Sequence, residues 1–139
     1  MNKKIIQITF FSLAVIFLLL MVEMFVPGVG AKLFKFLGPV VLFAEWGLFA
    51  LLGAILLFLT IKNKVKEPLR KFLLLTGVSA AGFVIFVLLH NLTSGLLSAL
   101  FNKEIEEPVF FILATIVCPI GFLVGAIRSA IIFFKKDAK

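Results

Sequence analysis

The sequence predicts an all-α integral membrane protein, built as an up-down bundle of four transmembrane helices. Four long apolar runs support this prediction, over residues 5–26, 40–61, 72–92 and 109–134. Each run is close to the roughly 20 helical residues that cross the hydrocarbon core of a bilayer. Composition agrees, because 63% of the residues are hydrophobic and 15% are charged, against about half and a quarter in soluble domains. The segments between the runs are short, so residues 1–139 are expected to form one membrane domain.

The first run follows Lys3 and Lys4 and ends at Pro27. A basic start before an apolar run also suits a signal peptide, but the apolar core of that class is only about 7–15 residues long. We therefore expect an uncleaved first helix. The following segment, 31–37, alternates lysine with large apolar residues. It is either a short interfacial helix or the first turn of the second span.

Pro68 separates the second span from the third, because proline cannot continue a helix without losing a hydrogen bond. The apolar pattern of the third span continues past His90 as far as Phe101. Either this helix protrudes from the bilayer, or it breaks within 91–95, where Asn, Thr, Ser and Gly occur together. We expect the break, with the remainder lying along the membrane surface. Pro108 then suits the first turn of the fourth helix.

The distribution of basic residues predicts the orientation of the chain. Ten of the 14 fall on one side of a four-pass topology. They are Lys3, Lys4, Lys62, Lys64, Lys66, Arg70, Lys71, Lys135, Lys136 and Lys139. Basic residues prefer cytoplasmic loops, so both termini are expected in the cytoplasm, with the chain in the cell membrane of a prokaryote. Anionic lipid headgroups are the expected partners of these lysines, and nucleic acid is not.

Three ionisable residues are predicted at a similar depth near the outer side of the bilayer. Glu23 precedes the end of the first helix, Glu45 follows the start of the second, and His90 ends the third span. Ionisable groups within spans are rare and costly, so this combination is a candidate cation or proton site. The alternative is interfacial packing, in which the carboxylates reach water or pair with Lys32 and Lys35. No set of residues points to a bound metal or another cofactor.

The fourth helix carries small residues at three- and four-residue spacing along one face. They are Ala114, Cys118, Gly121, Gly125 and Ser129. Such a face allows close helix contact, either within the bundle or with another chain. Pro119 removes one helical hydrogen bond, which predicts a kink. Arg128 is expected to anchor the helix at the inner headgroups, or otherwise to contact a substrate or a phosphate.

No motif here carries recognisable catalytic chemistry, because the chain has one histidine, one cysteine and no paired nucleophile and base. An enzyme is therefore not expected. The leading expectation is a non-catalytic accessory, scaffold or assembly subunit that docks through its small-residue helix faces, as a homo-oligomer or within a larger complex. The alternative is an oligomeric cation or proton channel or transporter that uses the outer Glu/His group.

Overall fold

The computed structural model describes residues 3–137, with side chains as far as Lys135, and every regular element in that range is helical. In chain order the elements are α1 (Lys3–Phe25), α2 (Val29–Leu37), α3 (Pro39–Lys62), α4 (Leu69–Phe101), α5 (Pro108–Ile112), the π-helical turn η1 (Leu113–Val117) and α6 (Cys118–Asp137). Four helical stretches are long and apolar enough to cross a membrane: α1, α3, α4 and Pro108–Lys135. The predicted four apolar helices are confirmed, and they indicate a multi-pass membrane protein.

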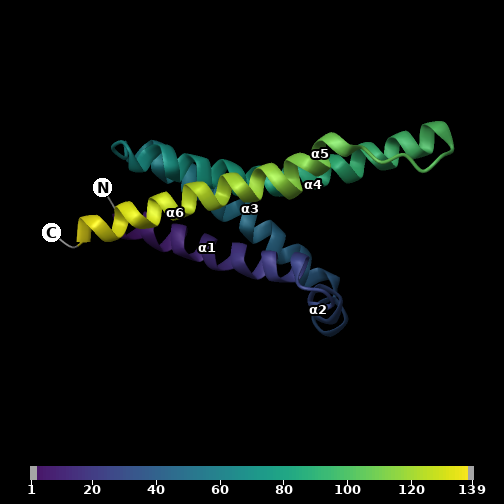
Figure 1. Cartoon of the computed structure of the whole chain (residues 1–139), viewed down its shortest axis with the longest axis horizontal. Helices are drawn as coiled ribbons and strands as arrows, with labels where there is room; N and C mark the ends of the chain where they lie inside the picture. Colours follow the sequence, from purple (N-terminus) through teal and green to yellow (C-terminus); the bar gives the residue numbers. More distant parts are fainter. Residues whose placement is uncertain (1–2, 138–139) are drawn as a thin grey trace.

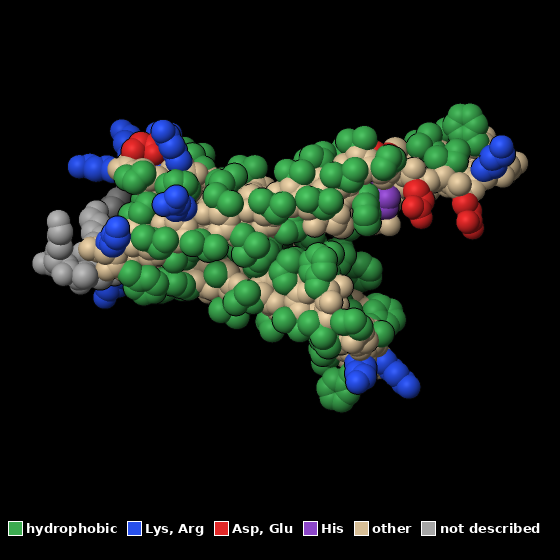
Figure 2. Space-filling model, in the orientation of Figure 1, with side chains coloured by type: hydrophobic (Ala, Val, Ile, Leu, Met, Phe, Trp, Pro, Cys, Tyr) green, Lys and Arg blue, Asp and Glu red, His purple; other side chains and the backbone are tan. Residues whose placement is uncertain are grey.

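The four long helices lie together at one end of the molecule and separate toward the other (Figure 1). The start of α1, the end of α6 and the loop between α3 and α4 share the first end, which we call the basic end because many Lys and Arg side chains gather there (Figure 2). At the opposite, open end, α1 and α3 diverge with α2 from α4 and α5. Lys139 and the side chain of Lys136, both predicted at the inner side, lie outside the described part of the chain.

Glycines bring α3 and α4 into backbone contact. A Cβ atom added at Gly53 would lie 3.1 Å from the carbonyl oxygen of Gly77, and one added at Gly77 would lie 2.9 Å from the carbonyl oxygen of Gly53. These distances leave no space for a side chain at either position. Apolar burial drives helices together only weakly within lipid, so close packing of this kind is a main source of helix association there.

The small-residue face of the fourth span packs against α4 in the same chain. Cβ atoms added at two of its members would meet α4 closely: at Gly121 the Ser79 hydroxyl oxygen at 2.6 Å, and at Gly125 the Phe72 carbonyl oxygen at 2.8 Å. Its other members are also buried: Ala114, Cys118 and Ser129. Of the two expectations for this face, the structure shows the contact within the bundle, so α4 already occupies the surface that another chain would need.

Aromatic side chains fill the centre where α1, α3, α4 and α6 meet. The Phe17 and Phe122 rings stack with their centroids 4.1 Å apart, and Phe49 lies 5.7 Å from Phe122. Phe83 of α4 meets Phe49 edge to face at 6.1 Å. All four side chains are at most 3% exposed. This layer closes the middle of the bundle with apolar groups.

The predicted break of the third span within 91–95 is wrong, because α4 continues without interruption for 33 residues. At about 1.5 Å per residue it is roughly 50 Å long, well beyond a hydrocarbon core of about 30 Å. The polar residues that suggested a break have partners compatible with a helix. The Asn91 amide donates to the Val87 carbonyl at 2.8 Å, and Ser94 and Ser98 bond to a later segment of the chain.

The segment between the first two spans contains a separate helix, α2, flanked by two glycines with left-handed backbone angles. Gly28 has φ +79° and Gly38 has φ +78°, values that other residues rarely adopt. Of the two alternatives for 31–37, the structure shows the short helix. Pro39 then begins α3, where a proline costs no helical hydrogen bond.

Next to Pro119 the hydrogen-bond pattern of the fourth span changes for one turn. The N–H of Cys118 donates to the carbonyl of Leu113, five residues earlier, which makes η1 a π turn. Proline has no N–H to continue the ladder, so a local change of register is expected before it. At the position where a kink is predicted, the structure shows this π turn. Arg128 is exposed on α6, and its role as an anchor stays a prediction.

Replacing Gly125 by alanine tests the contact between α4 and α6. The new Cβ would lie 2.8 Å from both the Phe72 carbonyl oxygen and the Thr76 backbone nitrogen, so a helix backbone must shift. We expect a loss of about 1–3 kcal/mol in the free energy of unfolding, the usual cost of overpacking. Gly47→Ala is the control, because nothing lies within 4 Å of its added Cβ. Unfolding in mixed micelles, followed by circular dichroism, measures the stability of both variants. A Gly125→Ala variant as stable as the wild-type protein would contradict this packing.

Candidate functional site

Two of the three predicted site residues, Glu23 and Glu45, lie side by side at the open end. Glu23 belongs to the last turn of α1, and Glu45 to the second turn of α3. Their carboxyl groups are within hydrogen-bonding reach of each other. Both side chains are half-buried, and the Oε1 atom of Glu45 is buried with no hydrogen-bond partner in the described part of the chain.

Carboxyl groups in such contact constrain each other's charge. Two ionised carboxylates repel strongly where the surroundings are apolar and water is scarce. The repulsion disappears when one group carries a proton that the other accepts in a hydrogen bond, or when a cation lies between them. The expected alternative, pairing with Lys32 or Lys35, is not seen, since neither lysine forms an ion pair with these carboxyls within residues 3–137. The arrangement is therefore chemically suited to hold a proton or a cation.

A cavity of about 440 Å³ opens beside this carboxyl pair, between α1, α2 and α3. Glu23 is its one acidic wall residue, and the other walls are apolar or aromatic. They are Met24, Gly30, Ala31, Phe34, Pro39, Leu42, Phe43 and Trp46. Trp46 also meets Phe83 of α4 edge to face at 5.9 Å, which ties the cavity wall to the central aromatic layer.

Gly30 sets how closely α2 approaches the site. A Cβ atom added there would lie 2.7 Å from the backbone carbonyl oxygen of Glu23. The absence of a side chain therefore lets the first turn of α2 rest on the last turn of α1. Sequence reasoning did not single out Gly30, because its importance depends on where α2 folds back.

His90 does not join the two carboxyl groups, which corrects the predicted group of three. Its Nδ1 atom lies 2.7 Å from the backbone carbonyl oxygen of Glu107 and 3.8 Å from the Glu107 carboxylate. In residues 3–137 no hydrogen bond or ion pair links His90 to Glu23 or Glu45. The cause is the divergence of the helices at the open end, which carries His90 away with α4 (Figure 2).

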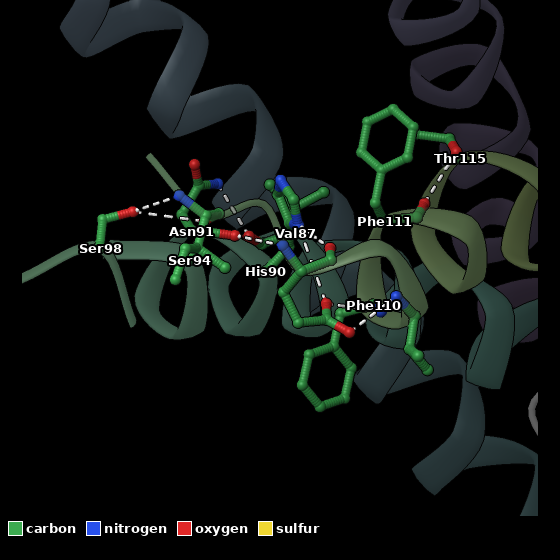
Figure 3. A network of polar contacts seen from close by, with 11 residues as sticks. Val87, His90, Asn91, Ser94, Ser98, Phe110, Phe111 and Thr115 are labelled. Atoms are coloured by element: carbon green, nitrogen blue, oxygen red, sulfur yellow. Dashed lines mark hydrogen bonds and ion pairs between the residues drawn. The ribbon is translucent and has the colours of Figure 1, made fainter. Parts of the chain in front are cut away.

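His90 instead begins a polar row on α4 that holds the returning chain (Figure 3). The Ser94 hydroxyl accepts from the Glu107 N–H at 2.9 Å, and the Ser98 hydroxyl accepts from the Ile105 N–H at 2.9 Å. Residues 90, 94 and 98 are four apart and share one helix face. Their side chains thus form hydrogen bonds with the backbone of an extended segment, which runs back along α4 toward α5.

Glu107 fixes the start of the fourth span, a role that sequence reasoning missed. Its carboxylate accepts from the backbone N–H groups of Val109 and Phe110, at 2.7 and 2.8 Å. Its position directly before Pro108 was the available signal, because negatively charged side chains are favourable near the N-terminus of a helix. Within the described residues, no three metal-ligating side chains come together here or elsewhere.

Comparisons with protein-family models, with curated proteins and with solved structures gave no match to this chain. The site is therefore interpreted from its own geometry.

Removing the serine hydroxyls tests the polar row. In the variant S94A/S98A the Ile105 and Glu107 amides lose their acceptors, and each such hydrogen bond contributes about 0.5–1.5 kcal/mol. Amide hydrogen exchange at these two positions should accelerate by about 2- to 10-fold. Asn91→Ala is the matched control, because that side chain bonds only within its own helix, to Val87. Unchanged exchange in the double variant would show that the segment is held otherwise.

Proposed function

We propose that this protein is a cation- or proton-binding membrane protein, in the functional class of small channels and transporters, with Glu23 and Glu45 as its binding groups. The single observation that carries the proposal is the contact of two carboxyl groups beside a cavity, with one buried carboxylate oxygen left unpartnered. Unpartnered acceptors in apolar surroundings are costly, which makes a bound proton or cation favourable.

The orientation belongs to the same proposal. Both termini and the basic end face the cytoplasm of a prokaryotic cell, where the lysines meet anionic headgroups of the cell membrane. The carboxyl pair then lies on the outer side. The aromatic layer of Phe17, Phe49 and Phe122 lies between this site and the basic end. A single chain thus supports binding at the outer side, and passage across the membrane requires an oligomer or a conformational change.

Carbodiimide labelling tests the proposed site. A hydrophobic carbodiimide modifies protonated carboxyl groups in apolar surroundings, so mass spectrometry should find the label on Glu23 or Glu45, decreasing as pH rises. In Glu45→Gln the new amide donates to Glu23 and favours its ionised form, so labelling of Glu23 should fall several-fold.

Glu104→Gln is the control, because this exposed carboxyl lies on the α4–α5 loop. In buffer without metal cations, a label confined to Glu104, Glu106 and Glu107 would remove the site. Proton and sodium uptake by liposomes containing wild-type protein or E23Q/E45Q then separates transport from binding. Transport predicts faster uptake by the wild-type protein.

The second candidate function is the accessory or scaffold subunit, and one observation favours it. The outer half of α4 exposes a leucine ridge, with Leu92, Leu96 and Leu100 at 68%, 58% and 69% exposure. Because α4 is longer than the bilayer core, this ridge extends past the span and offers a docking face. The small-residue face of α6 does not, since α4 covers it. Stoichiometric co-purification with a larger membrane complex, lost in L92S/L96S, would favour this candidate.

A further inference from the structure

The cavity beside the carboxyl pair has the properties of a binding site for an organic cation. Its volume, about 440 Å³, lies within the range of small-molecule pockets, roughly 300–1,000 Å³. Nearly all of its wall is apolar, and three wall residues are aromatic: Phe34, Phe43 and Trp46. Aromatic faces attract cations, most strongly where water is excluded.

Charge favours a cation over any other organic ligand. Glu23 lies in the wall, and the carboxyl group of Glu45 is close to it. The nearest lysines in sequence, Lys32 and Lys35, belong to α2, whose cavity-lining residues are Gly30, Ala31 and Phe34. At about 100° per residue, Lys32 and Lys35 lie roughly 150° and 90° from the centre of that lining face. The lysines therefore leave the acidic wall uncovered, while an anionic ligand would be repelled by it.

The surroundings of the cavity indicate how a ligand reaches it. Wall residues Met24, Phe34 and Phe43 are 39%, 52% and 71% exposed. Met24 and Phe43 belong to the candidate spans α1 and α3, whose exposed faces meet lipid in a membrane-spanning chain. In the proposed orientation, the cavity then opens toward the outer leaflet and its headgroup region. Amphiphilic cations concentrate in that region, with the charge near the headgroups and the apolar part in the hydrocarbon.

We propose that this cavity binds a lipophilic cation, such as a quaternary ammonium or phosphonium compound, which enters from the outer leaflet. The Glu23 carboxylate neutralises its charge, and Phe34 and Trp46 pack against its cationic centre. This inference rests on the proposed function, because it names the class of cation that the Glu23–Glu45 pair takes. A neutral lipid chain is the competing occupant, and it would make no use of the carboxyl pair.

Trp46 provides the measurement, because it is the only tryptophan of the chain and lies in the cavity wall. Its fluorescence is followed in nanodiscs of zwitterionic phosphatidylcholine. The full-length protein is titrated with benzyltrimethylammonium and, separately, with its uncharged carbon isostere neopentylbenzene. We expect saturable quenching by the cation with an affinity at least about tenfold above that of the isostere.

Variants identify the groups responsible. The double variant E23Q/E45Q should remove the tenfold preference, since it removes both carboxyl groups that can carry the negative charge. Phe34→Leu should weaken cation binding by about 2- to 5-fold, which corresponds to a cation–π contact at a partly exposed site. Phe36→Leu is its matched control, because Phe36 is 86% exposed on the same helix and does not line the cavity. Melting temperatures confirm that each variant is folded.

The outcomes separate this inference from the proposed function. Equal binding of cation and isostere, or a preference that persists in E23Q/E45Q, overturns the organic-cation site and indicates a lipid-filled cavity. The absence of saturable quenching also overturns it. In each case, carbodiimide labelling of Glu23 or Glu45 that falls with rising pH would leave the proton or inorganic-cation site standing. Absence of that labelling in buffer without metal cations would remove both.

Discussion

Backbone contact along α4 is the constraint on which the rest of the arrangement depends. Gly53 and Gly77 let α3 approach it on one side, and Gly121 and Gly125 let α6 approach it on another. Inside a bilayer, lipid competes with apolar side chains for every helix surface, so contacts this close favour protein over lipid. Within residues 3–137 the comparable glycine contact at the open end is that of Gly30, which joins α2 to α1 and does not join α1 or α3 to α4. The separation of α1 and α3 from α4, and the cavity between α1, α2 and α3, follow from this distribution.

Much of the architecture could be predicted from the sequence, because the length and spacing of apolar runs determine where a chain can cross a membrane. The prediction was wrong where local composition had to be weighed against distant partners. The residues of 91–95 are typical of a helix break when taken alone. In the molecule, Ser94 bonds to Glu107, thirteen positions later, and Ser98 bonds to Ile105. Such partners become visible only once the path of the returning segment is known.

The sequence predicts the position of the candidate site residues along the helix axes, but not how those residues are arranged across the bundle. Counting residues from the helix ends gives depth, which is why Glu23 and Glu45 were expected at one level and were found in contact. Depth alone placed His90 with them, although α4 leans away and its histidine meets Glu107. The cavity was not foreseen at all. It requires α2 to fold back onto Glu23 through Gly30, an approach that no periodicity in the sequence indicates.

The two glycines with positive φ that flank α2 determine where this helix lies. Gly28 and Gly38 have no side chain, so they can adopt the positive φ angles at which the chain turns into and out of α2. The nine-residue helix between them is held against α1, because Gly30 rests on the backbone of Glu23. Because α2 also forms one wall of the cavity, the backbone angles of these two glycines set the position of that wall relative to α1 and α3.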